Sequence, residues 1–308
     1  MKIEILLAAY NGERFIAEQI LSILDQEGED FGILVADDGS EDNTRERIEG
    51  LIGQYPGRIR LLERKKKASG ATENFFDLLE HAEAEYLMFA DQDDVWKKDK
   101  LKKTWKRMRQ MERKYGKSEP ILIHSDLMLA DGDLKITRES MHSFMRMKAH
   151  CKDLRHLLVE NNITGNTVMI NKAMQRAFIR PRHFVMHDWW LGLMAASFGK
   201  ISYIDEALVI YRQHGKNLLG AKNAYSWEEI KKRLSGKKEV RENYRKIFAQ
   251  ARELISLHRE RMKEEEIGKI EAFLQLEGLS RRGKIKSILK HKFFKSSVLM
   301  TIGEMLNI

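Results

Sequence analysis

The segment most suited to chemistry in this 308-residue chain is residues 86–96, YLMFADQDDVW. An apolar run leads into Asp91, Asp93 and Asp94, which fall within four positions. Carboxylates this close repel one another unless solvent, a cation or hydrogen bonds intervene. They suit Mg²⁺ or Mn²⁺, which bind one or two carboxylates and bridge substrate phosphates. The pattern favours a divalent-cation site, and the alternative is a solvated acidic turn that caps the next helix.

A second acidic pair, Asp37 and Asp38, follows the apolar residues 31–36 and precedes Gly39 and Ser40. Nucleotides bind at the carboxyl ends of strands in doubly wound sheets, where this turn would lie. We therefore expect one of the two carboxylates to accept a hydrogen bond from a base or a ribose. A turn whose Asp side chains only cap the following helix is the alternative.

A third group of residues, HDWW at 187–190, begins a helical pattern. Local sequence alone favours Asp188 as an N-cap, although a carboxylate there would also serve as a general base. Trp189 and Trp190 point in different directions on a helix, so that one would pack in the core and the other would offer its ring to a ligand. His214, in an expected loop, suits a metal or phosphate contact, or solvent.

The elements that must position these residues follow from the apolar pattern. The first half of the chain alternates short apolar runs with helical stripes, which is typical of βαβ units and a mostly parallel sheet flanked by helices. Strands are predicted at residues 3–8, 31–36, 59–62, 86–90 and 121–124. Two helical stripes consist of Phe15, Ile20, Ile23 and Leu24, and of Phe75, Phe76, Leu78 and Leu79. The acidic turns would then share the carboxyl edge of one sheet.

The second half of the chain has a different pattern. From Leu127 to His214 it is irregular, with short strands and the Trp-rich helix, and beyond Tyr225 it is densely charged with helical periodicity. The expected helical stripes are Trp227, Ile230 and Leu234, then Ile247, Ala251, Leu254 and Leu257, then Ile267, Ile270 and Leu274. We therefore predict an α-helical C-terminal region.

Seven short motifs, in their order along the chain, resemble those of family 2 glycosyltransferases of the GT-A fold, and within that family those of bacterial rhamnosyltransferases. They are AYNG at 9–12, DDGS at 37–40, GATEN at 70–74, DQDDVW at 91–96, TGN at 164–166, HDWW at 187–190 and YRQHG at 211–215. Each motif is modest by itself, and the resemblance depends on their order and on their placement at strand ends. It ends near residue 215, so the tail is outside it.

The resemblance implies an α/β protein of the GT-A fold that acts as a metal-dependent, inverting glycosyltransferase. It implies donor binding by Ala9, Tyr10, Asn11, Asp38, Asn74 and Asp91, a divalent metal (Mg²⁺ or Mn²⁺) on Asp93, Asp91 and His214, and acceptor or sugar contacts from Gly165, His187, Trp189 and Trp190. Asp188 would be the catalytic base. Many relatives have an acid where this chain has His187. Displacement at an anomeric carbon needs one base and a stabilised diphosphate but no second nucleophile, which favours inversion.

Composition limits the cellular setting. With 43% hydrophobic residues the chain can bury a full core, and its single cysteine, Cys151, excludes a disulfide scaffold and is typical of a reducing compartment. The first apolar run meets Asn11 and Gly12 too soon for a signal peptide, and no run of about 18 apolar residues is present to span a bilayer. We expect a cytoplasmic protein.

Charge is concentrated in the tail. The net charge is +9, and the residues after His214 contain 22 Lys and Arg against 12 Asp and Glu, so the preceding body is close to neutral. The segment 281–295, RRGKIKSILKHKFFK, would lie on the anionic inner face of a membrane through its charge and through aromatic insertion, or would be a solvated helix packed on the body. A basic tail with aromatics also suits nucleic acid, but the acidic strand ends argue against that partner.

The predicted organisation is a catalytic domain over 1–220, with a nucleotide-sugar half at 1–125 and an acceptor half at 126–220, followed by a basic helical region at 221–308. The expected reaction moves a sugar, rhamnose from dTDP-rhamnose, to a saccharide or lipid-linked saccharide acceptor in cell-surface polysaccharide synthesis. A UDP-hexose enzyme of the same fold is the alternative within this class. A nucleic-acid-binding protein is the alternative outside it.

Overall fold

The structure is a computed structural model that describes residues 2–63, 70–214, 237–297 and 300–301. The chain forms two compact units. Unit 1 consists of Met1–Met141, Thr164–Phe178 and Ser202–Gly220, and unit 2 of His142–Ile163, Ile179–Ile201 and Ala221–Ile308. Residues 126–220, expected to form one acceptor half, are therefore divided between the units. The boundary expected at residue 220 lies outside the described residues.

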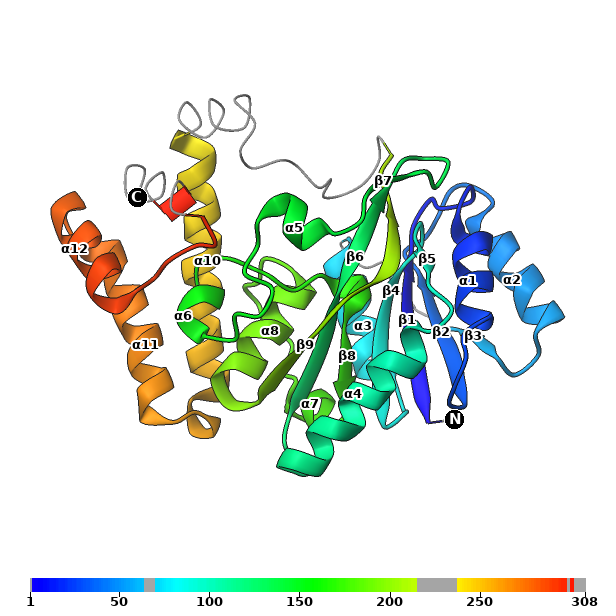
Figure 1. Cartoon of the computed structure of the whole chain (residues 1–308), viewed down its shortest axis with the longest axis horizontal. Coiled ribbons are helices and arrows are strands. Elements are labelled where there is room, and N and C mark those ends of the chain that lie inside the picture. Colours follow the sequence, from blue (N-terminus) through cyan, green and yellow to red (C-terminus); the bar gives the residue numbers. More distant parts are fainter. Residues whose placement is uncertain (1, 64–69, 215–236, 298–299, 302–308) are drawn as a thin grey trace. The chain divides into compact units, whose positions relative to one another are not determined.

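Unit 1 is built on a mixed β-sheet (Figure 1). The strands follow the order β3-β2-β1-β4-β8-β6-β9-β5, and β7 pairs with β6. Their bounds are β1 (Ile3–Ala9), β2 (Phe31–Asp37), β3 (Ile59–Leu61), β4 (Tyr86–Asp91), β5 (Val95–Trp96), β6 (Ile121–Ala130), β7 (Ile136–Arg138), β8 (Met169–Asn171) and β9 (Lys200–Arg212). The predicted parallel pairing is confirmed for β1 to β4. Beyond them, β8 joins β4 and β6 antiparallel, and β5 joins β9 antiparallel.

The parallel strands end together, and this sets the position of the site. β1 and β2 are buried along almost their whole length, as expected for strands covered on both faces. In the register of the sheet, Ala9 pairs with Asp37 and Ala8 pairs with Asp91. The acidic turns therefore share the carboxyl edge of the sheet, where α/β folds bind ligands.

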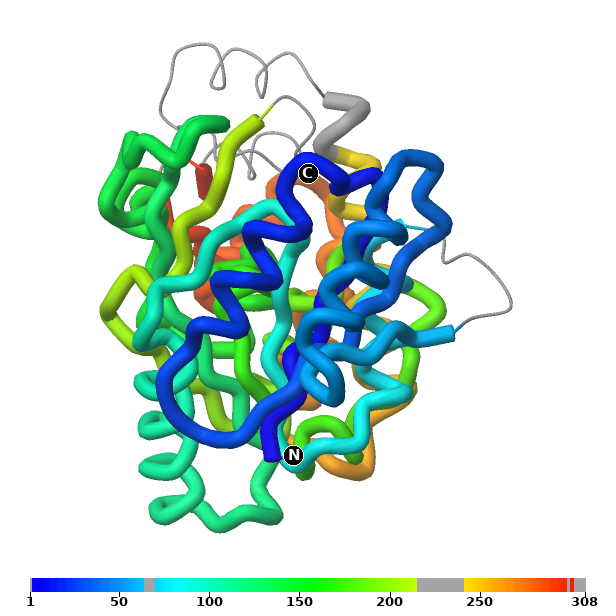
Figure 2. The backbone as a smooth tube through the Cα atoms, turned by 90° about the vertical axis from the view of Figure 1, so that its right-hand side faces the viewer, coloured from blue at the N-terminus to red at the C-terminus, as the bar shows by residue number. Residues whose placement is uncertain are grey.

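The predicted helical stripes of unit 1 face its core. Ile20 and Ile23 of α1 (Ile16–Leu24) are fully buried, as are Phe76 and Leu78 of α3 (Ala71–His81). The other described helices of this unit are α2 (Thr44–Gln54), α4 (Lys100–Tyr115), α7 (Lys172–Ala177) and the 3-10 turn η1 (Gly165–Thr167). Figure 2 shows the blue N-terminal part of the chain, in which α1 and α2 lie side by side.

Unit 2 is mainly helical, which confirms the prediction for the C-terminal region. Its elements are α6 (Leu154–Leu157), α8 (His187–Phe198), α10 (Lys237–His258), η2 (Arg259–Arg261), α11 (Glu264–Leu274), η3 (Gln275–Gly278) and α12 (Arg281–His291), and α5 (Met141–Met145) begins at its first boundary. Ala251, Leu254 and Ile270 of the predicted stripes are buried. The stripe expected at Trp227, Ile230 and Leu234 lies outside the described residues.

The basic segment around α12 packs two of its apolar side chains against other residues, as in the second of the two expected arrangements. Ile288 and Phe293 are 1% and 0% exposed, and the Phe293 ring centroid lies 5.4 Å from that of Phe273. These two side chains belong to the core of unit 2, so the prediction of bilayer insertion is wrong for them. Phe294 is half-buried, and association of the segment with a membrane stays a prediction. Leu289, by contrast, is exposed. Within the described part of the chain, no helix has both the length and the apolar character needed to cross a membrane.

Candidate active site

The acidic turn after β4 carries the residues expected at a metal. Asp91 is the last residue of β4 and is half-buried. Oδ2 of Asp93 lies 2.7 Å from Nε2 of His214, and the two side chains are 15% and 17% exposed. Asp94 is fully buried. Of the three predicted metal residues, Asp93 and His214 are therefore hydrogen-bonded to each other. Asp91 lies at the end of β4, where the same turn begins.

A buried polar cluster anchors this turn. Asn166 donates from its amide to the Asp94 carboxylate, and Nζ of Lys100 donates to the main-chain carbonyl oxygen of Asn166 at 2.6 Å. Burial, together with the charges of Asp93 and Asp91, raises the pKa of Asp94 well above its usual range. Burial also lowers the pKa of Lys100 well below its usual range, although the nearby carboxylates oppose this shift. The cluster fixes the turn from its buried side.

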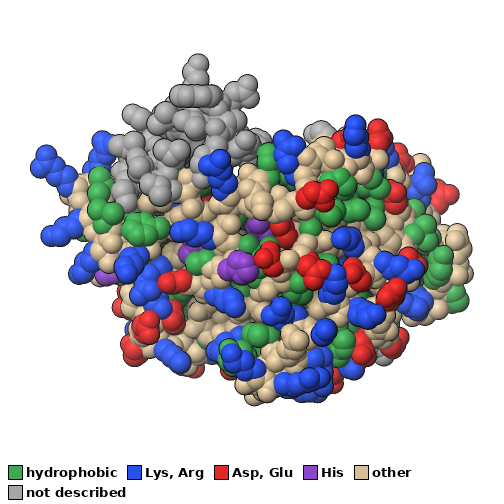
Figure 3. Space-filling view, viewed as in Figure 1, with side chains coloured by type: hydrophobic (Ala, Val, Ile, Leu, Met, Phe, Trp, Pro, Cys, Tyr) green, Lys and Arg blue, Asp and Glu red, His purple; other side chains and the backbone are tan. Residues whose placement is uncertain are grey.

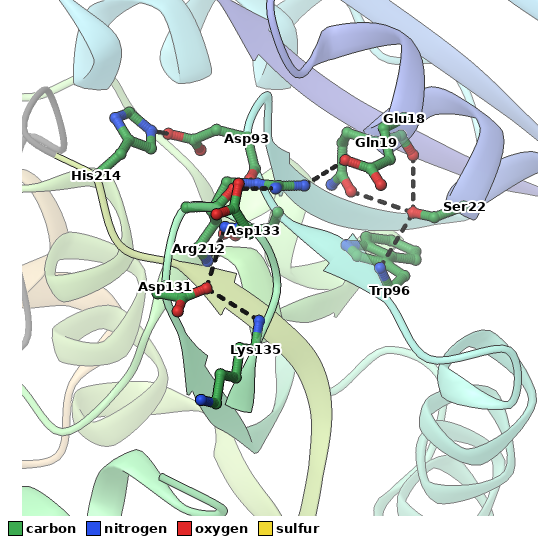
Figure 4. A network of polar contacts seen from close by, with 12 residues as sticks. Glu18, Gln19, Ser22, Asp93, Trp96, Asp131, Asp133, Lys135, Arg212 and His214 are labelled. Atoms are coloured by element: carbon green, nitrogen blue, oxygen red, sulfur yellow. Dashed lines mark hydrogen bonds and ion pairs between the residues drawn. The ribbon is translucent and has the colours of Figure 1, made fainter. Parts of the chain in front are cut away.

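Arg212, at the end of β9, holds the same turn from a second direction (Figure 4). Its main-chain N–H donates to Oδ1 of Asp94 at 3.2 Å, and its Nε donates to the carbonyl oxygen of Asp93 at 3.0 Å. The guanidinium also donates to the carbonyl oxygen of Gly132 at 2.7 Å and to the carboxylate of Glu18. One buried side chain thus ties the acidic turn to α1 and to the loop between β6 and β7.

The residues expected to bind the nucleoside lie at the same sheet edge. Ala9 is buried at the end of β1, and its carbonyl oxygen accepts a hydrogen bond from the main-chain N–H of Asp38 at 2.9 Å. Asp38 is 8% exposed, whereas Tyr10 is 51% exposed and Asn11 is also exposed. This loop presents Tyr10 and Asn11 to solvent beside the acidic turn, so it has the surface that a nucleoside could contact.

Asn74 has a structural position within this edge. It is 1% exposed, and its Nδ2 donates to the carbonyl oxygens of Ala36 at 2.9 Å and Ala9 at 3.5 Å. These bonds join the ends of β1 and β2. The expected contact of Asn74 with the nucleotide therefore stays a prediction, while its bonding to the two strand ends is a property of the fold.

In unit 2, Asp188 lies in the first turn of α8, whose N-cap residue is Met186. Oδ1 of Asp188 accepts hydrogen bonds from the main-chain N–H of Trp189 at 2.6 Å and from Nδ2 of Asn161 at 3.1 Å. Asp188 is therefore not the N-cap, although it satisfies one N–H of the first turn. Burial lowers the pKa of His187 to about 3, so its imidazole is neutral at pH 7.

The other residues expected near the sugars are buried. Trp190 is 0% and Trp189 is 9% exposed, and Nε1 of Trp189 donates to the carbonyl oxygen of Leu157 at 2.6 Å. Both indoles are packed into the interior, so neither presents an open face as the expected sugar platform. Gly165 is also buried and lies in η1 of unit 1. Acceptor contacts by these residues stay predictions.

The donor atoms at the acidic turn suit a divalent cation that is shared with a diphosphate. A carboxylate oxygen of Asp93 and an imidazole nitrogen of His214 are both ligand atoms for first-row divalent metals. They hydrogen-bond to each other directly, so a cation would bind by replacing that bond. Across the described ranges, no group of three or more His, Cys, Asp or Glu side chains is arranged to hold a metal. Diphosphate oxygens and water would supply the remaining ligands.

Sequence reasoning missed several residues that support the site. Arg212 and Asn166 fall within recognised motifs but received no role. Asn161 was not considered. Lys100 could have been found, because it shares helical spacing with the buried Thr104 and with the next turn of α4, which marks it as facing the core. The contacts of Arg212 are all tertiary and leave no local signal.

A mixed β-sheet with acidic turns at the carboxyl edge of its parallel strands is the arrangement expected of a GT-A type transferase. Similarity to known proteins supports the same class. Residues 4–115 match the model of the family Glycosyl transferase family 2. The chain is 30% identical over 227 residues to the dTDP-rhamnosyl transferase RfbG of Shigella flexneri, covering 70% of this chain and 74% of that protein. It is 34% identical over 236 residues to the putative teichuronic acid biosynthesis glycosyltransferase TuaG of Bacillus subtilis, covering 75% and 84%. The chain belongs to glycosyl transferase family 2.

Solved structures show the same fold at lower identity. Residues 1–349 of S. aureus TarS in complex with UDP superpose with a TM-score of 0.56 at 18% identity, covering 92% of this chain and 73% of that one. The mannosyltransferase PcManGT of Pyrobaculum calidifontis, in complex with GDP-Man and Mn²⁺, gives a TM-score of 0.51 at 13% identity, covering 99% and 80%. The GT-A fold expected from the motifs is thus confirmed.

Proposed function

We propose that this chain transfers a sugar from a nucleoside-diphosphate donor to a saccharide hydroxyl, with inversion at the anomeric carbon. The observation that carries the proposal is the convergence of two surfaces at one sheet edge: the exposed loop at Tyr10 and the acidic turn with Asp91 and Asp93. A sugar nucleotide needs such a pair, because its nucleoside and its diphosphate are adjacent. Membership of glycosyl transferase family 2 supports the reaction class.

In the proposed mechanism Asp188 accepts the proton of the acceptor hydroxyl while that oxygen attacks the anomeric carbon. The new C–O bond forms as the bond to the diphosphate oxygen breaks, and the electron pair leaves with the diphosphate. Asn161, which donates to Oδ1 of Asp188 at 3.1 Å, keeps the carboxylate oriented. A divalent cation held by Asp93 and His214 would supply neutralisation of the charge on the diphosphate.

For the donor we propose dTDP-rhamnose. The name of the S. flexneri relative supports this choice, as do the motifs DQDDVW and YRQHG. A UDP-hexose is the second candidate, because TarS, which shares the fold, is solved with UDP and with UDP-GlcNAc. For the acceptor we propose a saccharide or lipid-linked saccharide of a cell-surface polysaccharide, in line with the name of the B. subtilis relative.

A panel of sugar nucleotides tests the proposal. Purified protein is incubated with dTDP-rhamnose, UDP-glucose, UDP-GlcNAc or GDP-mannose, each with Mn²⁺, with Mg²⁺ or with EDTA, and release of the nucleoside diphosphate is followed. We expect release from dTDP-rhamnose that depends on the cation. Release only from UDP-sugars would favour the second candidate, and absence of release and of binding for every donor would contradict the transferase proposal.

We also propose that the protein is cytoplasmic and associates with an anionic membrane surface through charge alone. Arg281, Arg282, Lys286, Lys290 and Lys292 are exposed. In Figure 3 the left edge, where α12 lies in Figure 1, is rich in Lys and Arg. Each basic residue near an anionic surface contributes roughly 1 kcal/mol, and salt screens this attraction. Phe293 is buried and Phe294 is half-buried, so the proposal includes no aromatic insertion.

Vesicle sedimentation tests the membrane proposal. The triple variant Arg281→Glu, Arg282→Glu and Lys286→Glu should lose binding to phosphatidylglycerol vesicles at low salt. A control with the same charge change on α4 and the loop after it, Lys106→Glu, Arg113→Glu and Lys117→Glu, should bind as the parent does. Equal loss of vesicle binding in both variants would indicate attraction by net charge rather than by α12. Vesicle binding by the parent that does not change with salt concentration would also contradict the proposal.

A further inference from the structure

We infer that Gln92 is a positioning residue that fastens the loop at Tyr10 to the acidic turn, so that the nucleoside and diphosphate subsites of the donor site act as one unit. This rests on the proposed function, since it assumes that the two surfaces bind one donor. Gln92 stands between Asp91 and Asp93, yet it has no charge and contributes no strong metal ligand. Its function must come from the contacts of its carboxamide.

The Gln92 carboxamide pairs with the main chain of Tyr10 through both of its polar groups. The main-chain N–H of Tyr10 donates to Oε1 of Gln92 at 2.8 Å, and Nε2 of Gln92 donates to the carbonyl oxygen of Tyr10 at 2.8 Å. The two bonds resemble the exchange of a donor and an acceptor between paired strands. Only a side-chain amide offers both groups in this arrangement, and asparagine is one methylene shorter.

Gly12 provides the space for this pairing. A Cβ atom on Gly12 would lie 2.2 Å from Oε1 and 2.4 Å from Cδ of Gln92, well inside van der Waals contact. Gly12 is not among the glycines with positive φ, so backbone conformation does not require a glycine there. Gly12 of the AYNG motif is therefore explained by the space that the Gln92 carboxamide occupies.

The rest of the loop is fixed on its other side. The main-chain N–H groups of Asn11 and Gly12 donate to Oγ of Ser40 at 2.9 Å and to Oγ1 of Thr44 at 2.8 Å. These contacts join the loop to the turn after β2 and to the first residue of α2. The pairing with Gln92 joins it to the turn after β4, so one short loop connects the acidic turns of both strands.

This arrangement predicts a measurable coupling. If Gln92 holds the loop and the acidic turn in one geometry, a cation bound at Asp93 favours the loop conformation that binds the nucleoside, and each ligand raises the affinity for the other. Without the pairing, the cation would still bind the diphosphate, but it would no longer order the loop. The effect should therefore appear in the ratio of nucleotide affinities with and without Mn²⁺.

Calorimetry with dTDP and with UDP, in Mn²⁺ and in EDTA, tests this on the full chain. For Gln92→Ala we expect the Kd in Mn²⁺ to rise roughly tenfold and the gain in affinity from Mn²⁺ to shrink, because two hydrogen bonds to the loop are lost. The matched control is Gln175→Ala. Its Nε2 donates to the carbonyl oxygens of Leu79 at 2.8 Å and Ala82 at 2.7 Å, before β4 begins. That variant should melt at a lower temperature with an unchanged gain from Mn²⁺.

A second variant, at Gly12, disturbs the same pairing between Gln92 and Tyr10. Gly12→Ala should displace the carboxamide and weaken dTDP or UDP binding about as much as Gln92→Ala does. The double variant should be little worse than Gln92→Ala, because the three nearest atoms to the added Cβ all belong to Gln92. Additive losses, or a Mn²⁺ gain in Gln92→Ala equal to that of the parent, would overturn the inference. A parent protein that binds neither nucleotide would remove the proposed function, and this inference with it.

Discussion

Nε2 of His214 lies 2.7 Å from Oδ2 of Asp93, although the two residues are 121 positions apart. Asp93 belongs to the acidic turn after β4, and His214 follows β9, so their contact brings the fourth motif together with the last one. Arg212, two residues before His214, donates to the carbonyl oxygen of Asp93 at 3.0 Å and fixes the approach of the two segments. In the mechanism proposed above, a cation would take these two atoms as ligands, and the donor diphosphate would supply others.

We predict that Asp93→Ala abolishes the Mn²⁺-dependent part of nucleoside-diphosphate binding and leaves the fold intact. The change removes one turn carboxylate and no core volume. His214→Ala should reduce the gain in nucleotide affinity from Mn²⁺ by roughly tenfold or more, because one of the proposed side-chain ligands is lost. Calorimetry with dTDP or UDP, in Mn²⁺ and in EDTA, measures both effects.

The control for this prediction is Asp133→Ala, which removes an exposed carboxylate from the loop between β6 and β7. It should bind both nucleotides as the parent does. If Asp93→Ala retains the affinity gain from Mn²⁺, Asp93 is not a metal ligand, and Asp91 becomes the residue to test.

A second prediction concerns the buried amine under the acidic turn. Lys100→Met keeps the length of the side chain, but it leaves the carbonyl oxygen of Asn166 without this donor and removes the amine nitrogen packed 3.1 Å from the centroid of the Trp96 ring. Breaking a buried polar cluster on one side costs about 3 kcal/mol of unfolding free energy. Urea denaturation should show a loss of this size.

Lys103→Met on the same helix is the matched control. Lys103 is 35% exposed and makes ion pairs at the surface with Asp99 and Glu206, which are worth at most about 1 kcal/mol. If both variants lose the same small amount, the amine of Lys100 is not a structural support of the turn.

The strands that carry the site could be predicted because buried parallel strands appear as continuous apolar runs. β1, β2 and β4 each end one residue beyond the predicted end. β6 was predicted only to residue 124, because the polar sequence HSD at 124–126 interrupts the apolar run, yet these three residues are buried. Their burial depends on tertiary neighbours such as Tyr203, whose ring centroid lies 5.0 Å from that of His124.

The sequence could nominate candidate site residues, but it could not predict their geometry. The strand pattern alone predicted that Asp91 and Asp93 lie at the carboxyl edge of the sheet, and the structure confirms that position. The contact of Asp93 with His214 could not be derived, because β9, with charged residues at its centre, was not predicted as one long strand. The burial of Trp189 was also unpredictable, since α8 is apolar around its circumference and gives no amphipathic signal.

A third prediction is that His258 makes unit 2 sensitive to acid. Burial, with a contribution from Arg261, lowers the pKa of His258 from 6.5 to about 4. Between pH 6.5 and 4 the unfolded chain therefore binds a proton that the folded chain does not. The unfolding free energy falls as the pH decreases through this range, by up to about 1.4 kcal/mol per pH unit. Above pH 6.5 His258 does not contribute to the pH dependence of the unfolding free energy, because it is neutral in both the folded and the unfolded chain.

His258→Phe should reduce this sensitivity. Neither ring nitrogen of His258 has a hydrogen-bond partner within the described structure, and its ring centroid lies 6.0 Å from that of Trp190 and 5.1 Å from that of Phe198. A phenyl ring suits such an aromatic site. The difference between the melting temperatures at pH 4.5 and pH 7 should become smaller in this variant, although it should not vanish, because His187 also has a lowered pKa. A control at the exposed His183, His183→Phe, should keep the full difference seen in the parent.

The last prediction separates catalysis from binding at Asp188. Asp188→Asn keeps the shape of the side chain and an oxygen that can accept from the N–H of Trp189, but it removes the proton acceptor. If Asp188 is the base, kcat should fall by roughly 10² to 10⁴ while the Kd for the donor and the melting temperature change little. If the side chain only stabilises the first turn of α8, activity should survive, because Asn supports helix starts about as well as Asp. Transfer rate, donor affinity and melting temperature are measured on one preparation. A variant that transfers sugar at the parent rate would exclude Asp188 as the base. The search would then move to His187, whose imidazole is neutral at pH 7, or to Asp126, which is buried on β6 and accepts a hydrogen bond from Ser140.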